Sequence, residues 1–107
     1  MMEAHGRKLM EGRFGVIGTG KQEMTIAGTK YTIDDLLFKM GLLFDDAKPI
    51  DLVATPEGTF VVRYYDAQDQ RIVAHEFDAD LRFINEIRAH VAEWIGEDAY
   101  FSLFSGH

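Results

Sequence analysis

Cysteine is absent from this sequence of 107 residues. Its absence excludes disulfides, thiolate metal sites and a thiol nucleophile, and it suits a reducing compartment. Long apolar runs are also missing: no stretch approaches the roughly 20 residues that span a bilayer. The N-terminal residues lack the apolar segment of a secretory signal. We therefore expect a cytoplasmic protein without membrane contact.

Positive charge is scarce. Eleven Lys and Arg stand against 18 Asp and Glu, for a net charge of −7. The balance is +2 over residues 1–30, −3 over 31–65 and −6 over 66–107. An acidic body repels phosphate backbones and anionic lipids, so neither nucleic acid nor a membrane is an expected partner.

Apolar residues make up 47% of the chain and aromatic residues 12%, which suits a modest core in one domain. No linker or low-complexity tract divides it. We predict a single domain over residues 13–107 that ends in an apolar tail, residues 97–107. The preceding residues 1–12 form an N-terminal segment that can be flexible.

Alternating apolar residues predict three strands in the first third of the chain, around residues 14–16, 24–26 and 31–33. The last two form a hairpin with Gly28-Thr29 as its turn, which pairs Ile26 with Tyr31. A helix over residues 33–44 is expected next, with Thr32 as its N-cap, two aspartates in its first turn and Gly41 as a stop.

Three further strands are predicted over residues 50–55, 59–66 and 71–78. The loop Pro56-Glu57-Gly58 suits a type I turn followed by a left-handed glycine. The turns set the register, and one face of the sheet then becomes apolar. The expected pairs are Ala54 with Phe60, Leu52 with Val62, Ile50 with Tyr64, Asp66 with Arg71, Tyr64 with Val73, Val62 with His75, and Phe60 with Phe77.

The segment 79–96 has an apolar arc at helical spacing, so we predict a second helix capped by Asp78 or Asp80. The expected order is βββαβββα, with two antiparallel meanders that are each followed by a helix. The predicted fold class is a single two-layer α+β domain.

The stretch GVIGTGKQ, residues 15–22, fits most of the phosphate-binding loop G-x-x-x-x-G-K-[ST]. Gln22 replaces the hydroxyl residue that would hold magnesium. An alternating strand pattern follows where that motif requires a helix. We interpret the stretch as a loop whose glycines adopt positive φ, and we predict no nucleotide and no other cofactor.

Histidines and carboxylates offer two weak leads. Glu86, His90 and Glu93 would cluster on one face of the predicted second helix, where they could hold a divalent ion; a solvated charged face is the simpler interpretation. His75 falls on the predicted core face, where a packed histidine is more common than a general base. No metal site and no catalytic set is predicted, so we expect that the chain is not an enzyme.

The apolar stripe of the first helix leaves Phe38 and Leu42 on a second face. Either the aromatic tail or a second subunit could cover them, and both alternatives stay open. The candidate interface is Phe38, Leu42, Tyr100, Phe101 and Phe104.

The leading hypothesis is a non-enzymatic, acidic interaction or regulatory module, with a protein partner or a homodimer as its assembly. A second is an acidic inhibitor of the phage or mobile-element type that mimics nucleic acid in the basic groove of a partner. Its candidate contact surface is Asp66, Asp69, Asp78, Asp80, Glu97 and Asp98. A third is a small-ligand binder that uses the other sheet face, with Val53, Val61, Tyr65 and Ile72.

Overall fold

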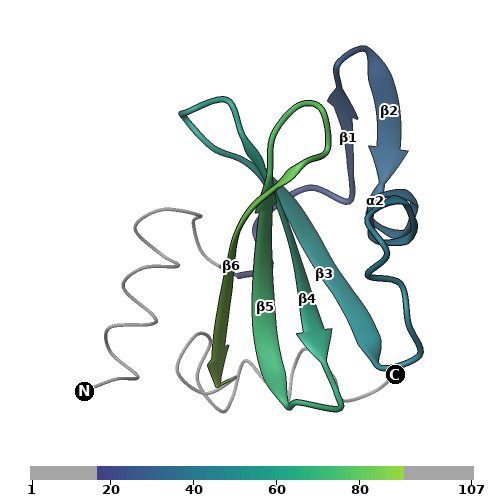
Figure 1. The fold of residues 1–107 in the computed structure, drawn as a ribbon, viewed down its shortest axis with the longest axis vertical. Helices are drawn as coiled ribbons and strands as arrows, with labels where there is room; N and C mark the ends of the chain where they lie inside the picture. The colour runs from purple at the N-terminus through teal and green to yellow at the C-terminus, as the bar shows by residue number, and fades with distance from the viewer. Residues whose placement is uncertain (1–16, 91–107) are drawn as a thin grey trace.

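The computed structural model describes residues 17–90, which form two antiparallel sheets and one short helix (Figure 1). The smaller sheet pairs β1 with β2, and the larger has the order β3-β4-β5-β6. An α+β arrangement of antiparallel strands is thereby confirmed. The elements are β1 (Glu23–Ile26), β2 (Thr29–Thr32), α2 (Ile33–Lys39), β3 (Ala47–Ala54), β4 (Phe60–Asp66), β5 (Arg71–Phe77) and β6 (Phe83–His90).

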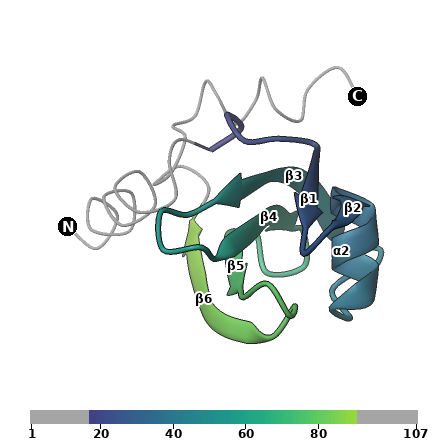
Figure 2. The same cartoon turned by 90° about the horizontal axis from the view of Figure 1, so that it is seen from above.

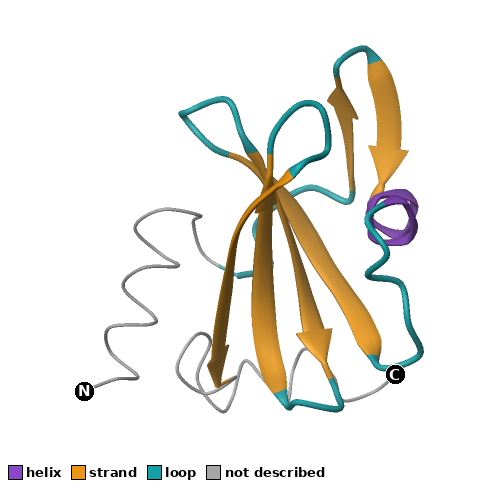
Figure 3. Ribbon diagram, viewed as in Figure 1, coloured by secondary structure: helices purple, strands orange, loops and turns teal. Residues whose placement is uncertain are grey.

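The predicted order βββαβββα is wrong in its second half, because residues 83–90 of the expected second helix form strand β6 (Figure 3). From Glu86 to His90, polar and apolar residues also alternate with period two, and that period prevails once β5 offers a pairing edge. Asp78 begins a turn: its carboxylate accepts hydrogen bonds from the amides of Asp80 and Arg82. The meander therefore has four strands. The first predicted strand and residues 91–96 lie outside the described part of the chain.

The first hairpin forms as expected but with a different turn. Ala27 and Gly28 have φ of 51° and 84°, the signature of a type I′ turn, so Met24 pairs with Tyr31 and Ile26 with Thr29. The predicted Gly28-Thr29 turn is wrong by one residue. The type I′ turn suits the twist of two adjoining strands, and here Ala27 adopts the positive φ that it requires.

Helix α2 begins as predicted and ends earlier. Thr32 accepts a hydrogen bond from the Asp35 amide, and the Asp35 carboxylate accepts one from the Thr32 amide, which completes a capping box. The helix ends at Lys39, and Gly41 has the positive φ of 72° expected at its C-terminal stop. The predicted extension to residue 44 does not form.

The meander registers are confirmed except at one position. All four predicted pairs between β4 and β5 form, as do the pairs of β3 at Ala54 and Leu52. A β-bulge between Pro49 and Asp51 removes Ile50 from its predicted pair with Tyr64. Ile50 therefore packs on the opposite face of the sheet from the one predicted.

Both faces of the larger sheet carry buried side chains. The first cluster joins α2 and β1 to one face, with Ile26, Leu36, Leu37, Leu52, Val62, Tyr64, Val73 and Phe77 among its members. The second lies on the other face, with Ile50, Val61, Ile72, Ala74 and Ala89. Helix α2 stands beside β3 and β4, on the opposite side of the molecule from β6 (Figures 1 and 2).

Candidate interaction surface

The glycine stretch binds a carboxylate of its own chain. The amides of Gly18 and Gly20 both donate hydrogen bonds to one oxygen of Asp51, each at 2.9 Å. Gly18 has the predicted positive φ, +89°, whereas the same prediction for Gly20 is wrong. Backbone amides that converge in this way form an anion-binding concavity. The resemblance to a phosphate-binding loop thus has a structural counterpart, in which the anion is an aspartate of β3.

The same stretch closes the outer edge of β3. Lys21 and Leu52 exchange two backbone hydrogen bonds of 2.8 Å, and the Gln22 side chain donates to the Ile50 carbonyl at 3.0 Å. A side chain on Gly20 would meet the Leu52 carbonyl and the Asp51 carboxylate. Glycine is therefore required at this position for close approach to the strand.

A buried ion pair lies beneath this loop. The Arg63 guanidinium donates from Nε and Nη2 to the two oxygens of Asp51, at 2.6 and 2.7 Å, and both side chains are fully buried. Glu76, also buried, accepts a 2.6 Å hydrogen bond from the Thr59 hydroxyl. Each of these buried charges has a close and well-oriented partner, so the loss of either partner should be costly.

The opposite face is only partly covered by α2. Its β5–β6 half carries His75, Phe83, Glu86 and Arg88, which the pairing of the two strands brings together. An extra residue at Ile84 makes a bulge that places Phe83 opposite Phe77 and against His75, with 4.7 Å between the ring centroids of Phe83 and His75. Phe83 is 61% exposed and Ile84 45%.

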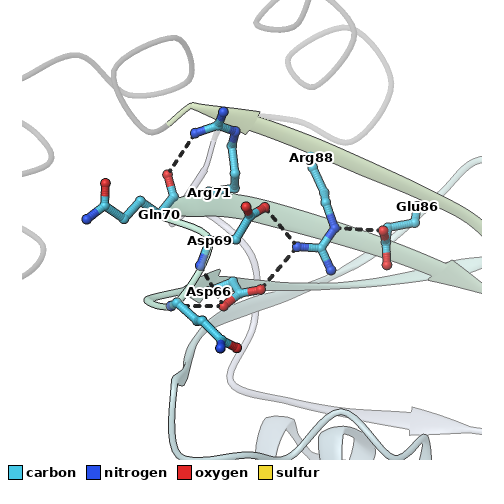
Figure 4. Close-up of polar contacts among 7 residues, drawn as sticks. Asp66, Asp69, Gln70, Arg71, Glu86 and Arg88 are labelled. Carbon is cyan, nitrogen blue, oxygen red and sulfur yellow. Dashed lines mark hydrogen bonds and ion pairs between the residues drawn. The ribbon is translucent and has the colours of Figure 1, made fainter.

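Arg88 is the centre of a charged cluster that joins β6 to the turn between β4 and β5 (Figure 4). Its guanidinium contacts the carboxylates of Glu86 at 2.8 Å, Asp66 at 3.1 Å and Asp69 at 3.2 Å. The hydrogen bond to Glu86 raises the pKa of Arg88 above its ordinary value. Burial alone would raise the pKa of Asp66. Hydrogen bonds from Arg88 and from the amides of Gln68 and Asp69 outweigh that effect, so the pKa of Asp66 lies below its usual value.

His75 is buried on the same face, as predicted. Burial lowers its pKa, and the nearby Glu86 opposes that effect only in part. Among the described residues, no group forms a hydrogen bond with its Nδ1 atom. The ring is therefore held in a largely apolar setting between the sheet and Phe83.

The predicted acidic surface divides into two groups. Asp66 ends β4 and Asp69 lies in the turn that precedes β5, whereas Asp78 and Asp80 follow the end of β5. Seven residues of strand separate them, roughly 20 Å. Glu97 and Asp98 lie outside the described residues.

The possible divalent-ion cluster depended on a helix that does not form. In strand β6, Glu86 and His90 lie four residues apart, about 13 Å along the strand, and Glu93 lies outside the described residues. Within residues 17–90, no group of three or more His, Asp or Glu side chains could hold a metal ion.

The candidate interface residues differ in exposure. Phe38 is 75% exposed on α2, whereas Leu42 packs against the first cluster. Tyr100, Phe101 and Phe104 lie outside the described part of the chain. Sequence reasoning missed Phe83 and Ile84, which it assigned to the apolar arc of a helix. The alternation from Glu86 onward was the signal for a strand.

The four residues proposed as a ligand-binding face belong to the second core cluster or pack against it. Val61 and Ile72 are fully buried there, while Val53 and Tyr65 are partly buried. Val53 also lines an open groove of about 430 Å³, together with residues of the glycine stretch, β1, β3 and Phe60.

Within residues 17–90, no helix is long and apolar enough to cross a membrane. No protein-family model matches the chain, and neither a curated protein nor a solved structure shows significant similarity to it.

Proposed function

We propose that this chain is a non-enzymatic protein-interaction module that assembles as a homodimer in the cytoplasm. One observation carries the proposal: large apolar side chains remain exposed in two groups near opposite edges of the larger sheet. The first group lies on α2 and in the loop after it, and the second begins β6; they are Phe38, Leu43 and Phe44, and Phe83 and Ile84. Exposed apolar groups rimmed by charge are typical of contact surfaces.

Two separate surfaces allow two kinds of contact. One can pair the chain with a second copy while the other remains available to a different protein. The division of the acidic residues between the two ends of β5 supports this module more than the nucleic-acid mimic, which needs a continuous acidic surface.

The test is the molar mass in solution, measured by sizing chromatography with light scattering. At about 100 μM, the wild type should run at twice the chain mass of 12.2 kDa. Phe38→Asp and Phe83→Asp place a carboxylate in each apolar group in turn, and Thr25→Asp on the exposed side of β1 is the matched control.

Because Phe38 and Phe83 are exposed, both variants should keep the far-UV circular dichroism of the wild type. The variant that becomes monomeric identifies the surface used for self-association. A monomeric wild type would refute the homodimer, and dimers in all three variants would exclude both apolar groups as the contact.

A further inference from the structure

The two edges of the larger sheet are not equivalent. The glycine stretch occupies β3 at Ile50 and Leu52, whereas within residues 17–90 no strand pairs with the outer edge of β6. Strand β6 is eight residues long and carries the exposed Phe83 and Ile84. An edge of this kind presents backbone donors and acceptors to another strand.

We infer that β6 pairs in antiparallel fashion with β6 of a second copy, with the two-fold axis at Ile87. The inference rests on the proposed self-association and names the surface that performs it. It leaves Phe38, which lies on α2 beside β3 and β4 and away from β6, available to a different protein.

The symmetry of the pair limits the register. Residues directly opposite each other in an antiparallel pair point to the same face, and a two-fold axis perpendicular to the sheet keeps each side chain on its own face. A residue of β6 therefore lies opposite itself or opposite one an even number of positions away.

Charge selects among the remaining registers. An axis at Ile87 places Glu86 opposite Arg88 of the partner subunit, twice by symmetry. An axis at Glu86 or at Arg88 sets like charges against each other, which destabilises a cross-strand pair. An axis at Asn85 brings Glu86 against the bulge at Ile84 and forms no charged pair.

The opposite face of β6 fits the same register. Ile87 packs against the second core cluster but remains partly exposed, and at the axis it would lie against its own copy. Asn85 would lie opposite Ala89 of the partner subunit. The apolar contact is thus central, and the charged pairs flank it on the other face.

The chain's lack of cysteine permits a direct test by oxidative cross-linking. Ile87→Cys places a thiol opposite its own copy, within the roughly 4.4–6.8 Å between Cα atoms that a disulfide spans. Asn85→Cys is the matched control, partly exposed on the same face of the same strand. Its two copies would lie about 13 Å apart along the strands and should not join.

With mild oxidant at about 100 μM protein, Ile87→Cys should give covalent dimer at least about tenfold faster than Asn85→Cys, because assembly raises the effective thiol concentration. An equimolar mixture of Asn85→Cys and Ala89→Cys should cross-link as a hetero-pair. This mixed experiment tests the same register without changing Ile87, so it remains valid if the circular dichroism of Ile87→Cys shows that this variant does not fold like the wild type.

The outcomes separate the two proposals. A non-covalent wild-type dimer in which neither arm cross-links overturns the β6 pairing and leaves the homodimer standing. Faster cross-linking of Asn85→Cys alone overturns the register. A wild type that is monomeric under the same conditions overturns both, and the edge of β6 would then be open to a strand of another protein.

Discussion

Substitution of the buried Asp51 should be among the most damaging single changes in this fold. Its two oxygens accept four hydrogen bonds: two from Arg63 and one each from the amides of Gly18 and Gly20. In Asp51→Asn, one oxygen becomes an NH₂ donor that faces another donor, and the negative charge opposite the guanidinium disappears.

Removing one partner of a buried ion pair costs about 3–5 kcal/mol. A domain of this size is stable by roughly 5–15 kcal/mol in total, so the substitution should remove about a fifth or more of the free energy of unfolding. At about 4 °C or more per kcal/mol, the melting temperature should fall by at least about 12 °C.

Urea unfolding followed by far-UV circular dichroism measures the effect. Asp69→Asn is the matched control, since Asp69 also pairs with an arginine but is half exposed, and its loss should cost no more than about 1 kcal/mol. If Asp51→Asn unfolds at the urea concentration of the control, the ion pair does not have the role that its burial implies.

A double replacement by leucine refines the same argument. Asp51→Leu with Arg63→Leu leaves neither charge of the pair in the core, so it should be more stable than Asp51→Leu alone. It should not reach the wild type, because the amides of Gly18 and Gly20 lose their acceptor. A double variant no more stable than the single one would show that the charge pair is not the source of the loss.

Three further perturbations test separate features. Gly20→Ala should lower the free energy of unfolding in urea by about 1–3 kcal/mol, because its Cβ collides with the Leu52 carbonyl of β3; an unchanged free energy would contradict the close approach. Thr32→Ala removes the capping box and should lower the free energy of unfolding in urea by about 1 kcal/mol. An unchanged urea midpoint would contradict a stabilising role of the cap. Burial lowers the pKa of His75 in the folded protein, so the unfolded chain takes up a proton first as pH falls below about 6.5, and the free energy of unfolding should decline from there toward the folded pKa. His75→Gln should weaken this pH dependence of the melting temperature between about pH 7 and 5. An unaltered dependence would refute the buried neutral ring.

The parts of the fold that local chemistry determines could be predicted from sequence. The cap at Thr32, the stop at Gly41 and the turn at Gly58 are short-range features, and the structure has all three. The registers between β4 and β5 followed from loop length and agree at every predicted pair. Such features depend on residues close in sequence, where turn geometry leaves few alternatives.

Long-range features were less accessible. Pro49 was a local signal for the bulge, since proline within a strand is confined to edges and bulges. Nothing in the sequence indicated that the bulge places Asp51 beneath a loop 31 to 33 residues away. Residues 83–90 are amphipathic at both helical and strand spacing, and only the free edge of β5 decides between them. The exposed residues of the candidate surface were missed for that reason, since a helix would have turned Phe83 and Ile84 toward the core.

The occupied edge of β3 limits how far the proposed assembly can grow. A sheet with two open edges can add a neighbour at each, and repeated addition gives a ribbon without a defined end. Here the glycine stretch takes one edge, and the proposed two-fold pairing at β6 would use the other, so the proposed assembly would close at two chains. In that assembly, the loop that resembles a phosphate-binding motif would limit the complex to a dimer by blocking strand addition at β3.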